Sequence, residues 1–245
     1  MIPFFRKIRK TLADDNKPLK YLRYAIGEIV LVVIGILIAV QLNNWNESRK
    51  QKLVEIDVLK GIRNDILKDT VDLNFNIRAY SYYIKQDSVT LNHLVNKKVL
   101  DQRLVKSLMA DANADWSILL HDSHFEEVKQ KGLSIISNLI LRETISKLYE
   151  FDYKFLILAE NSRENFDHSN HLRTELGQYF GYDSTGIIIN NVSYDKLLSN
   201  SNTLYYIKQG EQNKKSLLSV HESTLEFALK VVDSINKELT KLKKK

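Results

Sequence analysis

Two kinds of apolar pattern run along this chain. Near the N-terminus, every residue from Ile29 to Val40 is apolar. From Ile56 onward, apolar residues instead recur three and four positions apart, which is the spacing of one helix face. The unbroken run predicts a membrane helix, and the later spacing predicts amphipathic helices. The pattern therefore predicts an all-α protein in which one N-terminal transmembrane helix continues into a helical bundle.

The flanks of the apolar run extend it to the length of a membrane span. Tyr24 to Trp45 gives about 22 residues, or ~33 Å at the rise of an α-helix. Tyr24 and Trp45 fit the aromatic belts of a membrane, and Asn43 and Asn44 mark the exit to water. No small-x-small cleavage motif follows the run. We therefore predict an uncleaved anchor over residues 24–45, with a cleaved signal peptide and a buried soluble helix as alternatives.

Basic residues predict the orientation of this helix. Before the span lie Arg6, Lys7, Arg9, Lys10, Lys17, Lys20 and Arg23, and just after it lie Arg49, Lys50 and Lys52. The excess predicts a cytoplasmic segment over residues 1–23 and an extracytoplasmic domain over residues 46–245. We expect the inner membrane of a bacterium, with this domain in the periplasm. The net charge of +6 lies mainly at the chain ends, so we expect contact with the lipid bilayer and none with nucleic acid.

Glu28 is an ionisable residue about one turn inside the predicted span. Such residues are costly in lipid and usually face protein or water. Gly27, Gly35 and Ala39 lie on one ridge, Gly35 and Ala39 form a small-xxx-small pair, and Glu28 shares the face of Gly35. We expect this face to mediate self-association or docking to another membrane protein. Snorkelling of Glu28 toward the basic segment and a role in a proton or ion path are the alternatives.

The first helix carries a heptad seam beyond the membrane. After Pro18 the chain has no proline, which favours long helices. The seam consists of Ile66, Thr70, Leu73, Ile77, Tyr80, Ile84, Asp87, Leu91 and Leu94. Thr70 and Asp87 are its polar interruptions. A seam of this kind predicts a bundle helix or a coiled coil between copies, and matching stripes in later helices favour the bundle.

Further helices follow the seam. Residues 103–110 predict a short helix, and a Ser123-x-x-Glu126 capping box predicts another that ends at Gly132. A single long helix is predicted over residues 139–180, with a stripe that includes Leu148, Phe151, Phe155 and Leu158. A short helix capped by Ser193 and a last helix over residues 203–243 complete the pattern.

Three long helices and several short ones predict an elongated antiparallel bundle. If the first helix leaves the membrane, the second returns and the third leaves again. The loop Gly181–Val192 would then lie near the membrane surface.

Candidate chemistry is sparse. Two histidine pairs, His121 with His124 and His168 with His171, each have helical i, i+3 spacing. Together they could complete a tetrahedral zinc site if the fold joined them. No Glu-x-x-His or His-Glu-x-x-His motif accompanies them, so we interpret them as polar clusters and predict no metal or cofactor. The chain has no cysteine, nucleophile elbow or glycine-rich phosphate loop, so we predict no enzymatic activity.

Three segments carry a resemblance to a known family. They are the basic start Phe4–Arg9, the span Tyr24–Ala39 (YAIGEIVLVVIGILIA) and the exit Asn43–Glu47 (NNWNE). A looser fourth segment is Phe125–Gly132, with Arg142 and Tyr149 after it. On these residues the chain resembles an uncharacterised family of single-pass membrane proteins from Bacteroidetes-type bacteria. The resemblance implies the topology and the helical content, and it brings no activity.

These observations together predict a membrane-anchored, non-enzymatic interaction or scaffold protein. We expect it to self-associate through its transmembrane helix, or to bind another membrane or periplasmic protein. A sensory bundle that binds a small ligand and an accessory subunit of a transporter or channel are the alternatives.

Overall fold

The structure is a computed structural model that describes residues 18–112, 117–186, 188–190 and 194–244. Most of the predicted basic segment, and Ser193 as a helix cap, lie outside the described residues. The chain divides into two compact units, Met1–Val54 and Glu55–Lys245, and each is considered by itself. Across the described part, the regular secondary structure is helical apart from one pair of three-residue strands, so the all-α prediction is confirmed.

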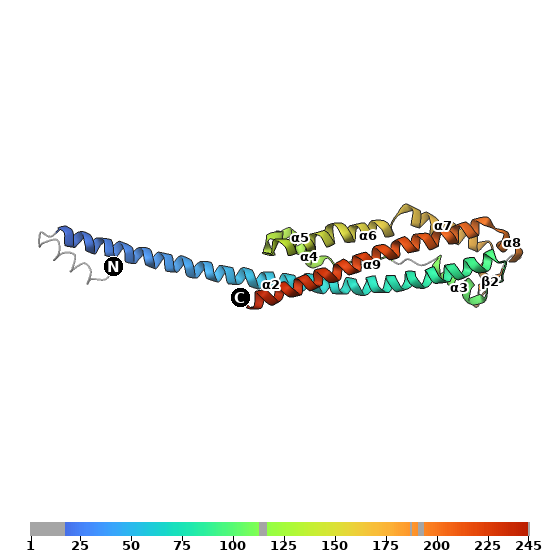
Figure 1. Ribbon diagram of the computed structural model, residues 1–245, viewed down its shortest axis with the longest axis horizontal. Helices are drawn as coiled ribbons and strands as arrows, with labels where there is room; N and C mark the ends of the chain where they lie inside the picture. The colour runs from blue at the N-terminus through green and yellow to red at the C-terminus, as the bar shows by residue number, and fades with distance from the viewer. Residues whose placement is uncertain (1–17, 113–116, 187, 191–193, 245) are drawn as a thin grey trace. The chain divides into compact units, whose positions relative to one another are not determined.

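Helix α2 runs from Pro18 to Val95 and contains 78 residues (Figure 1). Proline fits the first turn of a helix, because the N–H that it lacks has no partner there. The expectation that the first helix continues beyond Trp45 is confirmed. In the first unit, the N-terminal part of α2 is long and apolar enough to cross a membrane, since an 18-residue window of it has mean hydropathy 2.6 and none of that window is buried.

In the second unit, α2 pairs with α9, which runs from Ser201 to Lys244 (Figure 1). Arg63 contacts Asn236, Asn76 contacts His221, and Ser88 contacts Glu211, so the two helices are antiparallel. The predicted seam is confirmed as a bundle face: its members that are fully or almost fully buried include Ile66, Leu73, Tyr80 and Leu94.

The segment after residue 117 forms a chain of shorter helices. They are α4 (Ser123–Lys131), the 3-10 turn η1 (Leu133–Ile135), α5 (Leu139–Lys147), the π-helical turn η2 (Leu148–Asp152), α6 (Tyr153–Glu160) and α7 (Arg163–Gly177). The predicted capping box at Ser123 is wrong, because Ser123 is already inside α4 and Asp122 occupies the cap position without a side-chain bond. The predicted stop at Gly132 is confirmed.

The prediction of a single long helix over residues 139–180 is wrong. Helix α6 ends at Glu160 and α7 begins at Arg163, and Ser162 between them has an extended ψ of 139°. Asparagine and serine compete for backbone hydrogen bonds, which favours such breaks. The π-helical turn η2 accommodates one additional residue per turn and rotates the following face. Phe151, predicted to be in the stripe, is consequently 62% exposed, whereas Tyr153 is fully buried.

The same rotation turns two more predicted core residues outward. Phe155 is 52% exposed and Leu158 is 68% exposed, while Leu156 between them is fully buried. The stripe prediction therefore holds at Leu148, which is fully buried, and fails from Phe151 to Leu158. It holds again at three later members of the stripe, Leu172, Leu176 and Phe180, which are all buried.

The predicted direction of this segment is also wrong. Its beginning lies beside the start of the second unit, because the backbone N–H and hydroxyl of Ser137 both donate to Glu55. Its end, at Tyr179 and Phe180, packs with Leu94 and Leu108 in a separate apolar cluster. The segment therefore runs in the same direction as α2, and α9 returns. The loop after Phe180 lies at the Leu94 end of the bundle, not at the end where α2 enters it.

That loop is a small β-hairpin rather than a structureless connection. Strands β1 (Phe180–Tyr182) and β2 (Ile188–Asn190) are antiparallel, with Gly181 opposite Ile189. Gly186 has φ of 80°, a conformation that glycine adopts without steric cost. Asp183 stabilises the turn by accepting hydrogen bonds from the backbone and hydroxyl of Thr185.

Two further short helices cover this end of the bundle. Helix α3 runs from Gln102 to Asp111, close to its predicted bounds, and Asp101 caps it by accepting from the Leu104 N–H. Helix α8 runs from Tyr194 to Ser199 and precedes α9. The buried side chains of α3 join the apolar cluster of Leu94 and Phe180, so this end has a core of its own.

Candidate functional site

The predicted contact face in the membrane segment is open along α2. Gly27 and Gly35 have no atom outside their own helix within 4 Å. Glu28 is partly exposed and Ala39 is exposed. The predicted interface residues Tyr24, Asn43, Asn44 and Trp45 are exposed too, with Trp45 at 65%. The helix therefore presents bare backbone at its glycines, which is the surface that closely packed membrane helices use.

The first histidine pair lies against two buried carboxylates of α2. His121 Nδ1 is 2.9 Å from Asp69 Oδ1, and His124 Nδ1 is 2.6 Å from Asp65 Oδ2. The backbone N–H groups of both histidines donate to the same two carboxylates. Each aspartate thus holds one histidine through its side chain and its backbone, and the four residues dock the start of α4 onto α2.

The two aspartates differ in pKa because they are buried to different extents. Burial raises the pKa of Asp65, but hydrogen bonds from His124 outweigh it, so the net pKa is lowered. Asp69 is more deeply buried beside Tyr153, and there burial outweighs the bonds from His121, so the net pKa is raised. The ring of Tyr149 stacks on Phe125 at 4.4 Å and meets Tyr153 edge-on at 5.3 Å, which closes this site with aromatic rings.

We expect Gly61→Ala to weaken this docking. A methyl group at position 61 would overlap the ring of His124, and the ring, 45% exposed, would swing away from Asp65. Loss of a hydrogen bond to a charged group should outweigh the gain in helix propensity, for a net loss of about 1 kcal/mol in the free energy of unfolding. Thermal unfolding followed by circular dichroism measures it. Gly177→Ala is the matched control, since nothing lies within 4 Å of that position, and equal effects of the two changes would contradict the prediction.

The second histidine pair lies elsewhere in the bundle. His168 and His171 of α7 pack on Tyr206 of α9, with ring centroids 5.9 and 5.5 Å away. Burial lowers the pKa of His168 to about 4. The two pairs are not brought together, and among the described residues no group of three or more His, Asp or Glu has the geometry to hold a metal ion.

A buried histidine that the sequence analysis did not single out lies between these pairs. His221 of α9 is completely buried, and its Nε2 is 2.9 Å from Glu160 Oε1 and 3.4 Å from Asn76 Nδ2. Its Nδ1 is 2.9 Å from the carbonyl oxygen of Leu217. Glu160 also accepts a hydrogen bond from the Ile118 N–H. The group therefore joins α2, α6 and α9 in one buried contact.

A buried ion-pair group is the other site that was missed. Lys214 Nζ lies 2.6 Å from Asp111 Oδ2 and 2.9 Å from Asp87 Oδ2. Burial raises the pKa of Asp87 to about 7, and the positive charge of Lys214 opposes this. One turn away, burial raises the pKa of Glu211, but hydrogen bonds from two lysines and Ser88 lower it to about 2.

These buried polar groups have a structural purpose. Each carboxylate contacts a side chain or N–H group from another segment of the chain, and Glu211 is held in addition by Lys208 and Lys215 of its own helix. A misaligned register would leave a buried charge unpaired, which is far more costly than an imperfect apolar contact. The groups therefore align the helices. Asp87 was visible in the sequence as a polar interruption of the seam, whereas nothing local marks Lys214 or His221.

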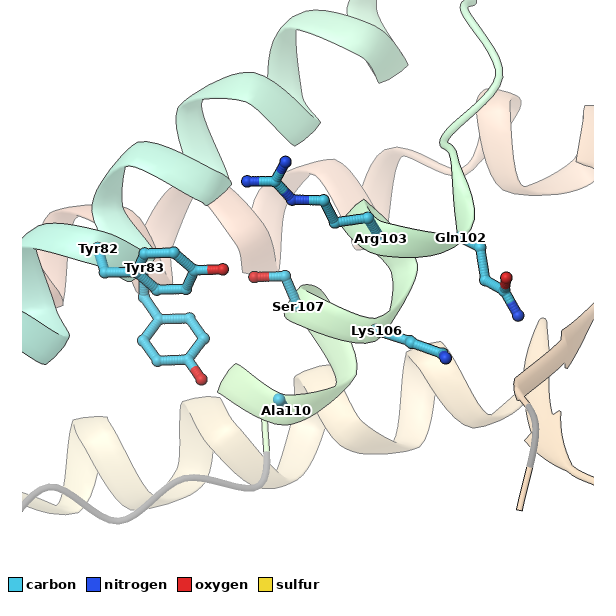
Figure 2. A pocket seen from close by; sticks show the side chains of 7 residues that line it. All are labelled: Tyr82, Tyr83, Gln102, Arg103, Lys106, Ser107 and Ala110. Carbon is cyan, nitrogen blue, oxygen red and sulfur yellow. The ribbon is translucent and has the colours of Figure 1, made fainter. Parts of the chain in front are cut away.

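One hollow opens between α2 and α3 (Figure 2). It has a volume of about 430 Å³, and its lining residues are Tyr82, Tyr83, Gln102, Arg103, Lys106, Ser107 and Ala110. The tyrosines come from α2 and the other five residues from α3. None of these residues was predicted to form a site.

Comparison with known proteins identifies the family of the chain, but it gives no activity. Residues 28–209 match a family of unknown function, DUF6090. The match covers most of the chain, and the protein belongs to this family. No curated protein and no solved structure matches the chain.

Proposed function

We propose that this protein is a membrane-anchored, non-enzymatic interaction protein that self-associates through the N-terminal part of α2. The observation that carries the proposal is the uncovered face at Gly27 and Gly35, where an added Cβ would meet no described atom within 4 Å beyond the local backbone of the helix itself. In lipid there is no hydrophobic force between helices, so close packing at small residues is the main source of association. Gly35 and Ala39 provide that small surface, and Glu28 adds a polar group on the same side.

The basic N-terminal segment supports a single-pass orientation in a bacterial inner membrane. In this topology the N-terminus is cytoplasmic and the helical second unit is periplasmic. The proposed partners are the lipid bilayer and a second copy of this chain, or another membrane or periplasmic protein.

Cysteine crosslinking in native membranes tests the association. The chain has no cysteine, so Leu42→Cys, seven residues after Gly35, introduces a single reporter on the proposed face. We expect Leu42→Cys to form a disulfide-linked dimer, and Gly35→Leu in that background to reduce the dimer at least about tenfold, because the larger side chain separates the backbones. Glu28→Gln should reduce it less. Val40→Leu is the matched control. Unchanged crosslinking in Gly35→Leu would show that this face does not mediate association.

Ligand sensing is the second candidate function. The hollow between α2 and α3 favours it, since that hollow lies in the second unit and is lined by polar and aromatic side chains.

A further inference from the structure

The hollow between α2 and α3 has the size of a small-molecule site. Its volume of about 430 Å³ falls within the range of typical ligand pockets, roughly 300–1,000 Å³. Figure 2 shows the two tyrosines of α2 facing the helix α3, with Ser107 pointing toward them from α3. Two aromatic rings thus form one wall, and α3 forms the other.

The charge of the hollow is positive. Arg103 and Lys106 are exposed side chains of its lining, and neither makes a hydrogen bond or ion pair with any residue that the structure describes. No carboxylate belongs to the lining. The neighbouring carboxylate of α3, Asp111, is already held by Lys214 at 2.6 Å. Two cations therefore remain available to a ligand, and none of the described lining residues is acidic.

Ser107 gives an independent indication of a ligand. Its side chain is only 9% exposed, and its hydroxyl has no hydrogen-bond partner within the described ranges. Buried hydroxyl groups almost always have a partner, because an unpaired one costs free energy. An oxygen atom of a bound molecule would satisfy this hydroxyl from the side of the hollow.

The two tyrosine rings on the α2 side of the hollow indicate which non-ionic group the ligand contains. The rings of Tyr82 and Tyr83 meet edge-on at 5.1 Å, and Tyr82 is 47% exposed. Burial raises the pKa of Tyr83, so its phenol keeps its proton and adds no negative charge at neutral pH. An exposed aromatic face next to cations suits a molecule with a flat or sugar-like ring and an acidic group.

We propose that this hollow binds a small organic anion in which a carboxylate or phosphate group is attached to a ring. The ring lies against Tyr82, and one oxygen of the anionic group accepts a hydrogen bond from Ser107. Arg103 and Lys106, whose side chains leave α3 in different directions, make the lining positive. Arginine and lysine bind such groups with charge-assisted hydrogen bonds, which are about twice as strong as neutral ones. The proposal does not depend on self-association, since none of these residues lies in the membrane segment.

Isothermal titration of the full-length protein in lipid nanodiscs tests the site with phenyl phosphate as the probe. Phenol tests the ring alone and inorganic phosphate tests the anion alone. We expect saturable binding of phenyl phosphate at a 1:1 ratio, and affinity at least about tenfold weaker for each of the other two probes.

Substitutions of the lining residues test whether phenyl phosphate binds in this hollow. The double change Arg103→Gln with Lys106→Gln should weaken phenyl phosphate at least about tenfold, and Ser107→Ala should weaken it several-fold. The matched control is Lys85→Gln with Lys98→Gln, which removes the same charge from exposed positions outside the hollow. Circular dichroism checks that each variant keeps its helical content. Equal weakening by the two double variants, or no saturable binding by the unmodified protein, would overturn the proposal.

Discussion

Replacing Lys214 with methionine is expected to lower the free energy of unfolding by about 3–5 kcal/mol, the usual cost of breaking a buried ion pair by removing one partner. Lys214 is the cation between Asp87 and Asp111, and both carboxylates are almost fully buried. Methionine fills a similar volume, so the change removes the charge with little loss of packing. For a chain of this size the loss corresponds to a decrease of about 10 °C in Tm.

The effect of Lys214→Met should depend on pH. Burial already raises the pKa of Asp87 to about 7 while Lys214 is present, and it raises the pKa of Asp111 as well. Without Lys214 both pKa values rise further, so the folded state binds protons more tightly than the unfolded state. Stability then falls as pH rises. We therefore expect the deficit of the variant relative to the unmodified protein to be larger at pH 8 than at pH 5.

Thermal unfolding of the full-length protein in detergent, followed by circular dichroism at both pH values, measures this deficit. Lys237→Met is the matched control, because Lys237 pairs with Asp233 on the exposed surface and such pairs contribute little. Adding Asp87→Asn to Lys214→Met should restore part of the loss by removing one unpaired charge. If Lys214→Met and Lys237→Met have the same effect, the buried group does not stabilise the bundle.

The long helices could be predicted from the sequence because their signal is local and repeated. The seam from Ile66 to Leu94 repeats the same spacing several times, and those positions are the ones that α2 turns toward its partners. The absence of proline after Pro18 also predicted a long first helix. A repeated apolar period determines which face is buried, but it does not determine the direction in which the next helix runs.

The second long segment shows where such a pattern fails. Up to Leu148 the expected face is buried, whereas Phe151 within the π-helical turn and Phe155 after it are exposed. The expected face is buried again only at Leu172 and beyond. One additional residue in a turn is invisible to a search for a period of 3.6 residues. Tertiary contacts favour the turn, because it places Tyr149 against Phe125 and Tyr153 against Tyr149.

The candidate sites were harder to predict because their members are distant in sequence. Asp87 appeared only as an interruption of an apolar seam, and its partner Lys214 lies on the last helix. The two histidine pairs had metal-like spacing, yet His121 and His124 each bind an aspartate of α2. Spacing within one helix cannot show which side chain of another helix will face it.

Replacing His221 with leucine is the second change that should have a large effect. His221 is completely buried, and its two ring nitrogens face a carboxylate oxygen of Glu160 and the carbonyl oxygen of Leu217. Leucine can donate to neither oxygen and leaves the Glu160 carboxylate, 3% exposed, without its contact to the ring. We expect a loss of about 3–5 kcal/mol in the free energy of unfolding.

His93→Leu is a closely matched control for His221→Leu. In His93, as in His221, Nδ1 lies 2.9 Å from the carbonyl oxygen four residues earlier, but the structure shows no carboxylate bonded to the His93 ring among the residues it describes. The comparison therefore controls for loss of the contact with the carbonyl oxygen. Urea unfolding of the full-length protein should show a much larger decrease for His221→Leu than for His93→Leu.

A double-variant cycle identifies the cause of that decrease. Glu160→Gln keeps an oxygen that can accept from the Ile118 N–H, but it removes the buried charge. If the unpaired carboxylate is responsible, Glu160→Gln should be less harmful in the His221→Leu background than in the unmodified protein, with a coupling energy of about 1–3 kcal/mol. If the two changes are simply additive, the loss in His221→Leu comes from packing alone, and the contact that joins α2, α6 and α9 is not held by its charges.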